Sequence, residues 1–506
     1  PDPKDYFCLS LLHKMKLRCL NRCLPPQYQV LIGGFAIQLV LGTLYCWGNL
    51  TTYITSYLRQ LNPELTYSDT LLVYVSIIGT QALTMWAGGI VEEKLGPGLT
   101  AFLGGSILSG GIIFSSLARS LWAFIALYGV CFGLGLALAY PCPLSCGFQW
   151  MPRHKGLVSG FIVSGFGGGA FVFNQVATRL ANPEDATASE VGADGRLYYG
   201  PDVTDRVPAM LRALGGCYFV LVLLGSLVLR DPPRRRGEST SLLAAATVTD
   251  GKYMVTMDSD GKLPRQRLRT RTRTYTLDGT EEMSVPKIPR VYSINALRLL
   301  TAVERSPREL VREPQYYHLS FCFMLTAIGG LFIAGTYKTF GAQLKDDAYL
   351  SMVGSVGSIA NAAGRLIIWG PLSDRFGFQR ALLVLTTCLA SLLLTYPLSF
   401  SSPTLFMVWT SAIFLCYGGN YVVYPTATAQ LFGLEHCAAN YGLVWVVTGL
   451  TATIFITWLE NGSGGSYQPI ILGCMAVIGL VMAVLLRILY FRKGKTGEDE
   501  DPTLYG

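Results

Sequence analysis

The chain has 506 residues, of which 51% are hydrophobic and only 14% are charged, and its formal net charge is +8. A water-exposed surface needs a larger share of charged residues, so the composition excludes a soluble globular enzyme and indicates a protein surrounded by lipid. The positive charges gather in short segments between apolar runs. This pattern is typical of membrane topology, and no nucleic-acid partner is expected.

Apolar runs of roughly 20 residues, each long enough to cross a bilayer as a helix, recur along the chain. They predict twelve transmembrane helices, at residues 28–50, 70–91, 98–117, 121–148, 156–178, 211–229, 316–338, 349–372, 379–399, 404–430, 438–459 and 467–490. We therefore expect an all-α, polytopic membrane protein in which two six-helix halves surround a central cavity.

The distribution of Lys and Arg predicts the orientation of these helices. Basic residues occur in the N-terminal tail (1–27), beside Lys155 between the fourth and fifth spans, and at the start of the C-terminal tail (491–506). Short cytosolic segments retain such charges, whereas the loop at 179–207 is acidic and fits the opposite side. Both termini are expected in the cytosol. The plasma membrane is expected in preference to an organelle membrane.

A polar segment separates the two halves, which span residues 28–230 and 316–490. Residues 231–315 are rich in Arg, Thr, Ser and Asp and show no sustained apolar period, so they predict a disordered cytosolic linker. The 13 cysteines show no Cys/His spacing suited to zinc. Neither a metal nor a cofactor is expected.

Three short sequences occur once in each half, with nearly the same separation each time. Gly-x-x-x-acid-base-x-Gly occurs at 89–96 and 370–377, aromatic Tyr-Pro pairs end at Pro141 and Pro425, and Gly-Leu-Val begins at Gly156 and Gly442. Three matches at nearly one spacing are improbable by chance. They indicate a six-plus-six duplication, which is common in transporters because two bundles move against each other around one site.

The repeated Gly-x-x-x-acid-base-x-Gly loop, which follows the second and eighth spans, resembles the signature of the major facilitator superfamily. The glycines allow two helices to approach closely. The acid-base pairs Glu93-Lys94 and Asp374-Arg375 are expected to act as a gate that holds the cytosolic ends of the halves together and releases them. The alternative is a tight solvated turn with a surface ion pair.

Arg365 is the one ionisable residue that lies deep within a predicted span. At about 1.5 Å per residue, its separation from Asp374 places it near the middle of a hydrocarbon core about 30 Å thick. Charged residues at that depth are costly and usually functional. Because a guanidinium matches a carboxylate and not a cation or a sugar, the residue predicts an organic-anion site. The alternative is that Arg365 pairs with a backbone carbonyl or with an acidic residue of the protein.

The spans expected to line the cavity carry several tyrosines: Tyr45, Tyr140, Tyr417, Tyr421 and Tyr424. A tyrosine offers an apolar wall and one hydroxyl donor, which together suit a small carboxylate. The last three have helical spacing and share one helix face. The alternative is that this face is ordinary core.

Within the superfamily, residues 361–365 (Asn-Ala-Ala-Gly-Arg) and 440–445 (Asn-Tyr-Gly-Leu-Val-Trp) resemble the oxalate/formate antiporter family, a relative of the monocarboxylate transporters. The resemblance implies that the following residues bind the substrate: Arg365, Asn361, Trp445, Thr448, and, as parts of an aromatic box, Tyr45, Tyr140, Tyr417 and Tyr421.

Two positions depart from the family pattern. The oxalate-carrying member has a lysine where this chain has Thr448, and one cation leaves the second charge of a dicarboxylate uncompensated in a medium of low dielectric. This favours a monocarboxylate. The monocarboxylate relatives usually carry an aspartate at the place of Asn361, which leaves open whether a proton or a counter-anion is coupled.

These observations predict a secondary transporter that moves pyruvate, lactate or formate across a membrane by alternating access. Three alternatives remain: an oxalate or dicarboxylate exchanger, a non-transporting membrane sensor or scaffold, and a facilitator for neutral solutes. An enzyme is not expected, because no nucleophile–base pair or phosphate loop stands out.

Overall fold

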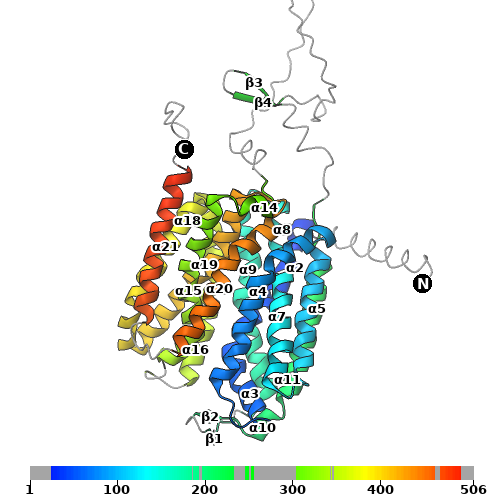
Figure 1. Cartoon of the computed structure of the whole chain (residues 1–506), viewed down its shortest axis with the longest axis vertical. Coiled ribbons are helices and arrows are strands. Elements are labelled where there is room, and N and C mark those ends of the chain that lie inside the picture. The colour runs from blue at the N-terminus through cyan, green and yellow to red at the C-terminus, as the bar shows by residue number, and fades with distance from the viewer. Residues whose placement is uncertain are drawn as a thin grey trace, which may run out of the picture. The chain divides into compact units, whose positions relative to one another are not determined.

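The structure, a computed structural model, describes residues 24–184, 186–192, 196–232, 246–249, 252–255, 304–341, 344, 347–461 and 468–491. These residues are almost entirely helical (Figure 1). Ten helical segments among them are long and apolar enough to cross a membrane. The predicted eighth and twelfth spans also fold as helices, so the prediction of an all-α polytopic membrane protein is confirmed.

The first half comprises α2 (Pro26–Leu41), η1 (Gly42–Cys46), α3 (Trp47–Arg59), α4 (Tyr67–Leu95), α5 (Pro97–Ser115), α6 (Leu121–Phe124), η2 (Ile125–Val130), α7 (Cys131–Ala139), α8 (Pro141–Trp150), α9 (Lys155–Ala181), β1 (Glu190–Val191), β2 (Leu197–Tyr198), α10 (Pro201–Thr204) and α11 (Val207–Ser226). The first span continues through α3, beyond its predicted end at residue 50. Polar side chains of this extension contact the neighbouring helix: Thr55 Oγ1 in α3 lies 2.7 Å from Thr70 Oγ1 in α4.

The second half comprises α14 (Pro307–Leu310), α15 (Pro314–Gly341), α16 (Asp347–Ala363), η3 (Gly364–Trp369), α17 (Gly370–Phe376), α18 (Phe378–Thr395), η4 (Tyr396–Ser401), α19 (Pro403–Leu431), α20 (Cys437–Asn461) and α21 (Gln468–Phe491). The eighth predicted span corresponds to α16, η3 and α17 in succession. Its middle part, η3, is a π-helical turn. Such turns are rare and occur often at functional sites.

The duplicated loop folds in the same way in both halves. Gly96 ends α4 with φ +82°, and Gly377 ends α17 with φ +81°. Only glycine adopts this backbone conformation readily, so each copy of the motif ends in a glycine for the same steric reason. We call the end of the bundle that carries the loops 93–96 and 374–377 the motif end. The opposite end, which carries β1, β2 and α10, is the far end (Figure 1).

The two halves pack through matching pairs of helices: α4 lies against α20, and α9 lies against α16 and α17. Glycines bring the backbones close at both contacts. A Cβ atom at Gly89 would lie 2.1 Å from the backbone nitrogen of Ala439, and one at Gly160 would lie 2.4 Å from the carbonyl oxygen of Arg365. Close packing of small residues therefore joins the halves, as is usual between membrane helices.

The chain divides into two compact units, the helical bundle (residues up to Pro232 and from Glu304) and residues 233–303. In the second unit, the described residues form an antiparallel hairpin of β3 (Ala246–Thr249) and β4 (Lys252–Val255). The rest of the predicted linker up to residue 303 lies outside the described residues, as do 1–23 and 492–506 of the predicted tails. The linker was predicted to extend to residue 315, whereas residues from Glu304 onward already contact the bundle.

Candidate functional site

Arg365 lies at the junction of the two halves, on the π-helical turn η3, and its side chain is fully buried. Its Nη1 donates to the carbonyl oxygen of Val163 in α9 at 2.9 Å, so the side chain of one half reaches the backbone of the other. Glycine at position 418 makes room for it, because a Cβ there would lie 3.1 Å from the Arg365 Nε. The π-helical turn and a facing glycine thus accommodate a large cation inside the bundle.

No charge in the described part of the chain balances that of Arg365. Nε and Nη2 have no hydrogen-bond partner, and within the described ranges no carboxylate forms an ion pair with the guanidinium. The rings of Phe166 and Tyr421 lie 5.6 and 5.1 Å from the guanidinium carbon, and their faces offer only weak compensation. A buried cation with two unused donors is unfavourable alone and favours a bound anion.

The tyrosines predicted to line the site form an aromatic cluster beside Arg365. The Tyr45 hydroxyl in η1 donates to Tyr417 at 3.0 Å, and the hydroxyls of Tyr417 and Tyr421 in α19 are 2.8 Å apart. Tyr140, which immediately precedes α8, packs edge-on against Phe166 at 5.6 Å between ring centroids. The structure therefore brings together all four tyrosines of the predicted site, with hydroxyls from both halves.

Tyr424 differs from the other tyrosines of α19. Its hydroxyl lies 3.1 Å from Thr326 Oγ1 in α15, and its ring stacks on Phe323 at 4.1 Å. It thus belongs to packing within the second half. Phe166 and Phe323 were not singled out from the sequence, because nothing in a phenylalanine's local pattern shows which aromatic neighbours it will meet.

Asn361, Trp445 and Thr448 are also buried, and each carries a polar atom without a partner. Asn361 Nδ2 donates to the Phe414 carbonyl at 2.8 Å, which leaves its Oδ1 unpaired. The Trp445 ring lies 5.7 Å from that of Tyr421, and its Nε1 has no acceptor. The Thr448 Oγ1 and the Tyr140 hydroxyl are unpaired as well. These polar atoms are therefore available to form hydrogen bonds with a polar ligand.

At the motif end, Asp374 connects the second half to the first. Its Oδ1 and Oδ2 accept the backbone N–H groups of Gly156 and Leu157, each at 2.7 Å. These groups belong to the first turn of α9, where unpaired N–H donors and the helix dipole favour a negative charge. Burial raises the pKa of this carboxyl, and the two N–H donors oppose that shift.

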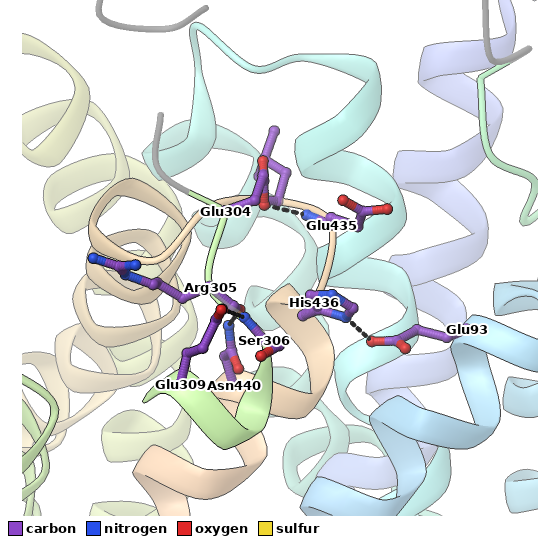
Figure 2. Close-up of polar contacts among 9 residues, drawn as sticks. Glu93, Glu304, Arg305, Ser306, Glu309, Glu435, His436 and Asn440 are labelled. Atoms are coloured by element: carbon purple, nitrogen blue, oxygen red, sulfur yellow. Dashed lines mark hydrogen bonds and ion pairs between the residues drawn. The ribbon is translucent and has the colours of Figure 1, made fainter. Parts of the chain in front are cut away.

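Glu93, the residue of the first half that is equivalent to Asp374, contacts the second half. The Glu93 carboxylate lies 2.6 Å from Nδ1 of His436, which immediately precedes α20 (Figure 2). Of the predicted gate residues, the two acids therefore reach across the halves. The bases Lys94 and Arg375 form no ion pair among the residues that the structure describes. Arg375 lies over its neighbour Phe376, 5.4 Å from the ring centroid.

Lys155 forms a further contact between the two halves. From the sequence, this residue indicated only that its segment lies in the cytosol. Its Nζ is buried and donates to the Ala429 carbonyl at 3.0 Å, near the last turn of α19. A cation is favoured at the carboxyl end of a helix. These hydrogen bonds and ion pairs between the two halves lie at mid-depth or at the motif end, so the halves are joined at the motif end in this conformation.

A short segment that we call the strap, residues 304–309, holds the loop between α19 and α20 (Figure 2). The Glu304 carboxylate accepts the N–H groups of Leu434 and Glu435 at 3.1 and 2.9 Å. Within the strap, the N–H of Ser306 donates to Glu309 at 2.9 Å and lowers the pKa of that carboxyl. The strap therefore fixes the loop that presents His436 to Glu93.

Replacing Glu304 with Ala is expected to loosen this loop. Each lost hydrogen bond contributes about 1 kcal/mol, so amide exchange of residues 432–436 should rise roughly fivefold or more. Hydrogen exchange followed by mass spectrometry measures this change. Glu64→Ala, at an exposed position, serves as the control, and unchanged protection in the Glu304 variant would show that the strap does not hold the loop.

Comparison with known proteins agrees with this architecture. No family model matches the chain. It is 30% identical to apicoplast pyruvate carrier 1 of Toxoplasma gondii, over 82% of this chain and 79% of that protein. It is 22% identical to the oxalate:formate antiporter of Oxalobacter formigenes (85% and 82%) and 23% identical to the uncharacterized MFS-type transporter YhjX of Escherichia coli strain K12 (84% and 87%). The chain belongs to the major facilitator superfamily of membrane transporters.

Proposed function

We propose that this chain is a secondary transporter that carries a small monocarboxylate, such as pyruvate, by alternating access, and that Arg365 binds the carboxylate. The observation that carries the proposal is the fully buried guanidinium whose Nε and Nη2 are unpaired, with no acidic partner in the described part of the chain. The relatives named as carriers of pyruvate and of oxalate and formate support this class of substrate.

The chemistry of binding follows from the donors that remain free. Nε and one Nη of a guanidinium can hold both oxygens of a carboxylate in a bidentate pair. The tyrosine hydroxyls add donors, while the rings form an apolar wall that suits a short carbon chain. Binding neutralises Arg365, so the cost of enclosing its charge falls and the halves can close over the loaded site. A transporter built in this way changes conformation more readily when it is loaded.

Alternating access requires that the motif end open and close. We propose that Asp374, Glu93 and Lys155 stabilise the closed form, since each contacts the opposite half. Opening then breaks these contacts, while a reciprocal closure forms at the far end. Lys94 and Arg375, the bases of the predicted gate, would act in the open form.

We assign to Thr448 the selectivity for monocarboxylates over dicarboxylates. Its hydroxyl is buried and unpaired, and a threonine carries no charge that could pair with a second carboxylate. Replacing Thr448 with Lys is expected to raise transport of oxalate relative to pyruvate at least about tenfold, because pairing one buried charge is worth more than 1.4 kcal/mol. Competition between labelled pyruvate and unlabelled oxalate measures the ratio, with Thr448→Met as a control of similar length. An unchanged ratio would remove Thr448 from the selectivity site.

The proposal has two further parts: the membrane in which the protein resides, and the ion whose movement is coupled to transport. The sequence favoured the plasma membrane and cytosolic termini, whereas a relative is named for an organelle, the apicoplast. A fluorescent tag, combined with protease access to each terminus, distinguishes these locations. Any coupled proton or counter-anion is identified by the gradient that drives uptake.

The experiment that tests the function is exchange of labelled substrate in vesicles containing the purified full chain. Pyruvate, lactate and formate are expected to exchange, whereas glucose is not. An oxalate exchanger would prefer oxalate to all three. A sensor or scaffold would bind a carboxylate without counterflow, and that result would contradict the proposal.

A further inference from the structure

Glu92 is a buried acid that the transport mechanism above does not use. It is the last residue on the buried face of α4, one turn beyond Gly88 and Gly89, and it is only 6% exposed. At Gly89 the helix meets the backbone of Ala439 in α20, so this face lies on the junction between the halves. The equivalent position in the other copy of the motif is Ser373, which is uncharged.

The surroundings of Glu92 do not stabilise its ionised form. Its Oε2 has no hydrogen-bond partner, and the Ser145 hydroxyl in α8 is the neighbour that favours the ionised form. The other acids nearby are Glu93 on the same helix and Asp231, which follows α11. The remaining titratable neighbours are thiols on α8 and α20: Cys142, Cys146 and Cys437.

Basic side chains of this region contact acceptors other than Glu92, and His436 lies 2.6 Å from the Glu93 carboxylate. The Lys155 Nζ donates to the Ala429 carbonyl at 3.0 Å, and the Arg230 Nη2 donates to Gln29 Oε1 at 3.4 Å. Across the described ranges, no Lys, Arg or His forms an ion pair with Glu92. A buried carboxylate that forms no ion pair of its own is strongly unfavourable, whereas the neutral acid is tolerated.

The burial of Glu92 depends on contact between the halves. At Gly89 this face of α4 meets Ala439 of α20, and Ser145 and Cys437 line a cavity of about 10 Å³ between α8 and the first turn of α20. A separation of the motif ends that drew α20 away from this face of α4 would let water reach the carboxyl group. The ionised form then becomes favourable.

We propose that Glu92 is a proton-binding site: its carboxylate binds one proton as the motif ends of the two halves close, and releases it when they separate. The proton comes from water, forms an O–H bond on the carboxylate, and returns to water on opening. This deepens the proposed function and rests on it in one respect: closure of the motif end becomes a step of transport that consumes a proton.

The test is the pH profile of pyruvate exchange by the full chain in vesicles, with equal pH on both sides. The wild-type rate should fall on the alkaline side, by up to about tenfold per pH unit, because closure then requires an increasingly scarce proton. Glu92→Gln, which is permanently neutral, should flatten the profile. Glu92→Ser, which copies the equivalent residue Ser373, should flatten it as well. Glu64→Gln, an exposed acid, should retain the wild-type profile.

A wild-type rate independent of pH, or an alkaline limb that persists in both Glu92 variants, would overturn the proposal. A second readout does not depend on the cargo. The infrared difference spectrum between acidic and alkaline samples should contain a protonated-carboxyl band that disappears in Glu92→Gln, and its persistence would also overturn the assignment. If no monocarboxylate is exchanged at any pH, the proposed function fails. The infrared result then still tests whether Glu92 binds a proton.

Discussion

Replacing Arg365 with Gln is expected to abolish monocarboxylate exchange while leaving the protein folded. The substitution removes the charge that a bound carboxylate would neutralise. Removing one partner of a buried charge pair costs about 2–5 kcal/mol, or roughly 30-fold to several thousand-fold in affinity. Folding should survive, because the guanidinium makes a single hydrogen bond, to the Val163 carbonyl, and its other donors are unused. Exchange of labelled pyruvate in vesicles, together with the thermal midpoint of the purified protein, measures both effects.

Two further variants separate the shape of the guanidinium from its charge. Arg365→Lys keeps the charge but loses the planar pair of donors, so it should retain only a small part of the activity. Arg119→Gln removes an exposed arginine near the far end and should leave exchange unchanged. If Arg365→Gln exchanges pyruvate at the wild-type rate, the carboxylate is bound elsewhere.

The second large effect is expected at Asp374. Replacing it with Ala removes two charge-assisted hydrogen bonds to the first turn of α9, each worth about 1.5–3 kcal/mol. The closed form of the motif end should lose most of its advantage, so exchange should fall at least about tenfold. Cys437, now buried at the start of α20, should become reactive toward a maleimide. Quantifying the labelled Cys437 peptide measures this opening.

Glu93→Gln is the matched comparison, because it alters the equivalent acid of the other half. The Glu93 side chain is 34% exposed and His436 is 27% exposed, so water already screens their interaction. Pairs of this kind contribute about 0–1 kcal/mol, and the loss of exchange should stay within roughly fivefold. Equal effects of the two variants would contradict the assignment of the main closing contact to Asp374. Unchanged protection of Cys437 in Asp374→Ala would contradict it too.

The sequence was sufficient to predict the helical spans, the buried position of Arg365 and the tyrosine cluster of Tyr45, Tyr417 and Tyr421. Lipid imposes long apolar runs, and a charge within such a run is rare enough to be found by inspection. The duplicated motif also indicated where the halves meet, and the structure gives both copies the same glycine-ended turn. Tyr417 and Tyr421 lie one helical turn apart, so their shared face could be read from spacing alone.

Contacts that depend on how the halves dock were not predictable in this way. Lys155 follows other basic residues, so its charge indicates only the cytosolic side of the membrane. Its partner Ala429 is far away in the sequence. Glu304 lies in a segment whose composition indicates disorder, yet two N–H groups of a loop in the second half fix its carboxylate. Glu92 stands in the motif next to the expected gate acid, and only its burial distinguishes it from Glu93. Periodicity describes one helix, whereas these properties arise between helices.

The central claim is that Arg365 holds the carboxylate of the cargo, and a structure determined with saturating pyruvate tests it most directly. The proposal predicts that the pyruvate carboxylate lies within hydrogen-bonding distance of the Arg365 Nε and Nη2, with the tyrosine hydroxyls around it. A guanidinium that still contacts only the Val163 carbonyl, with pyruvate bound at another place, would contradict the proposal.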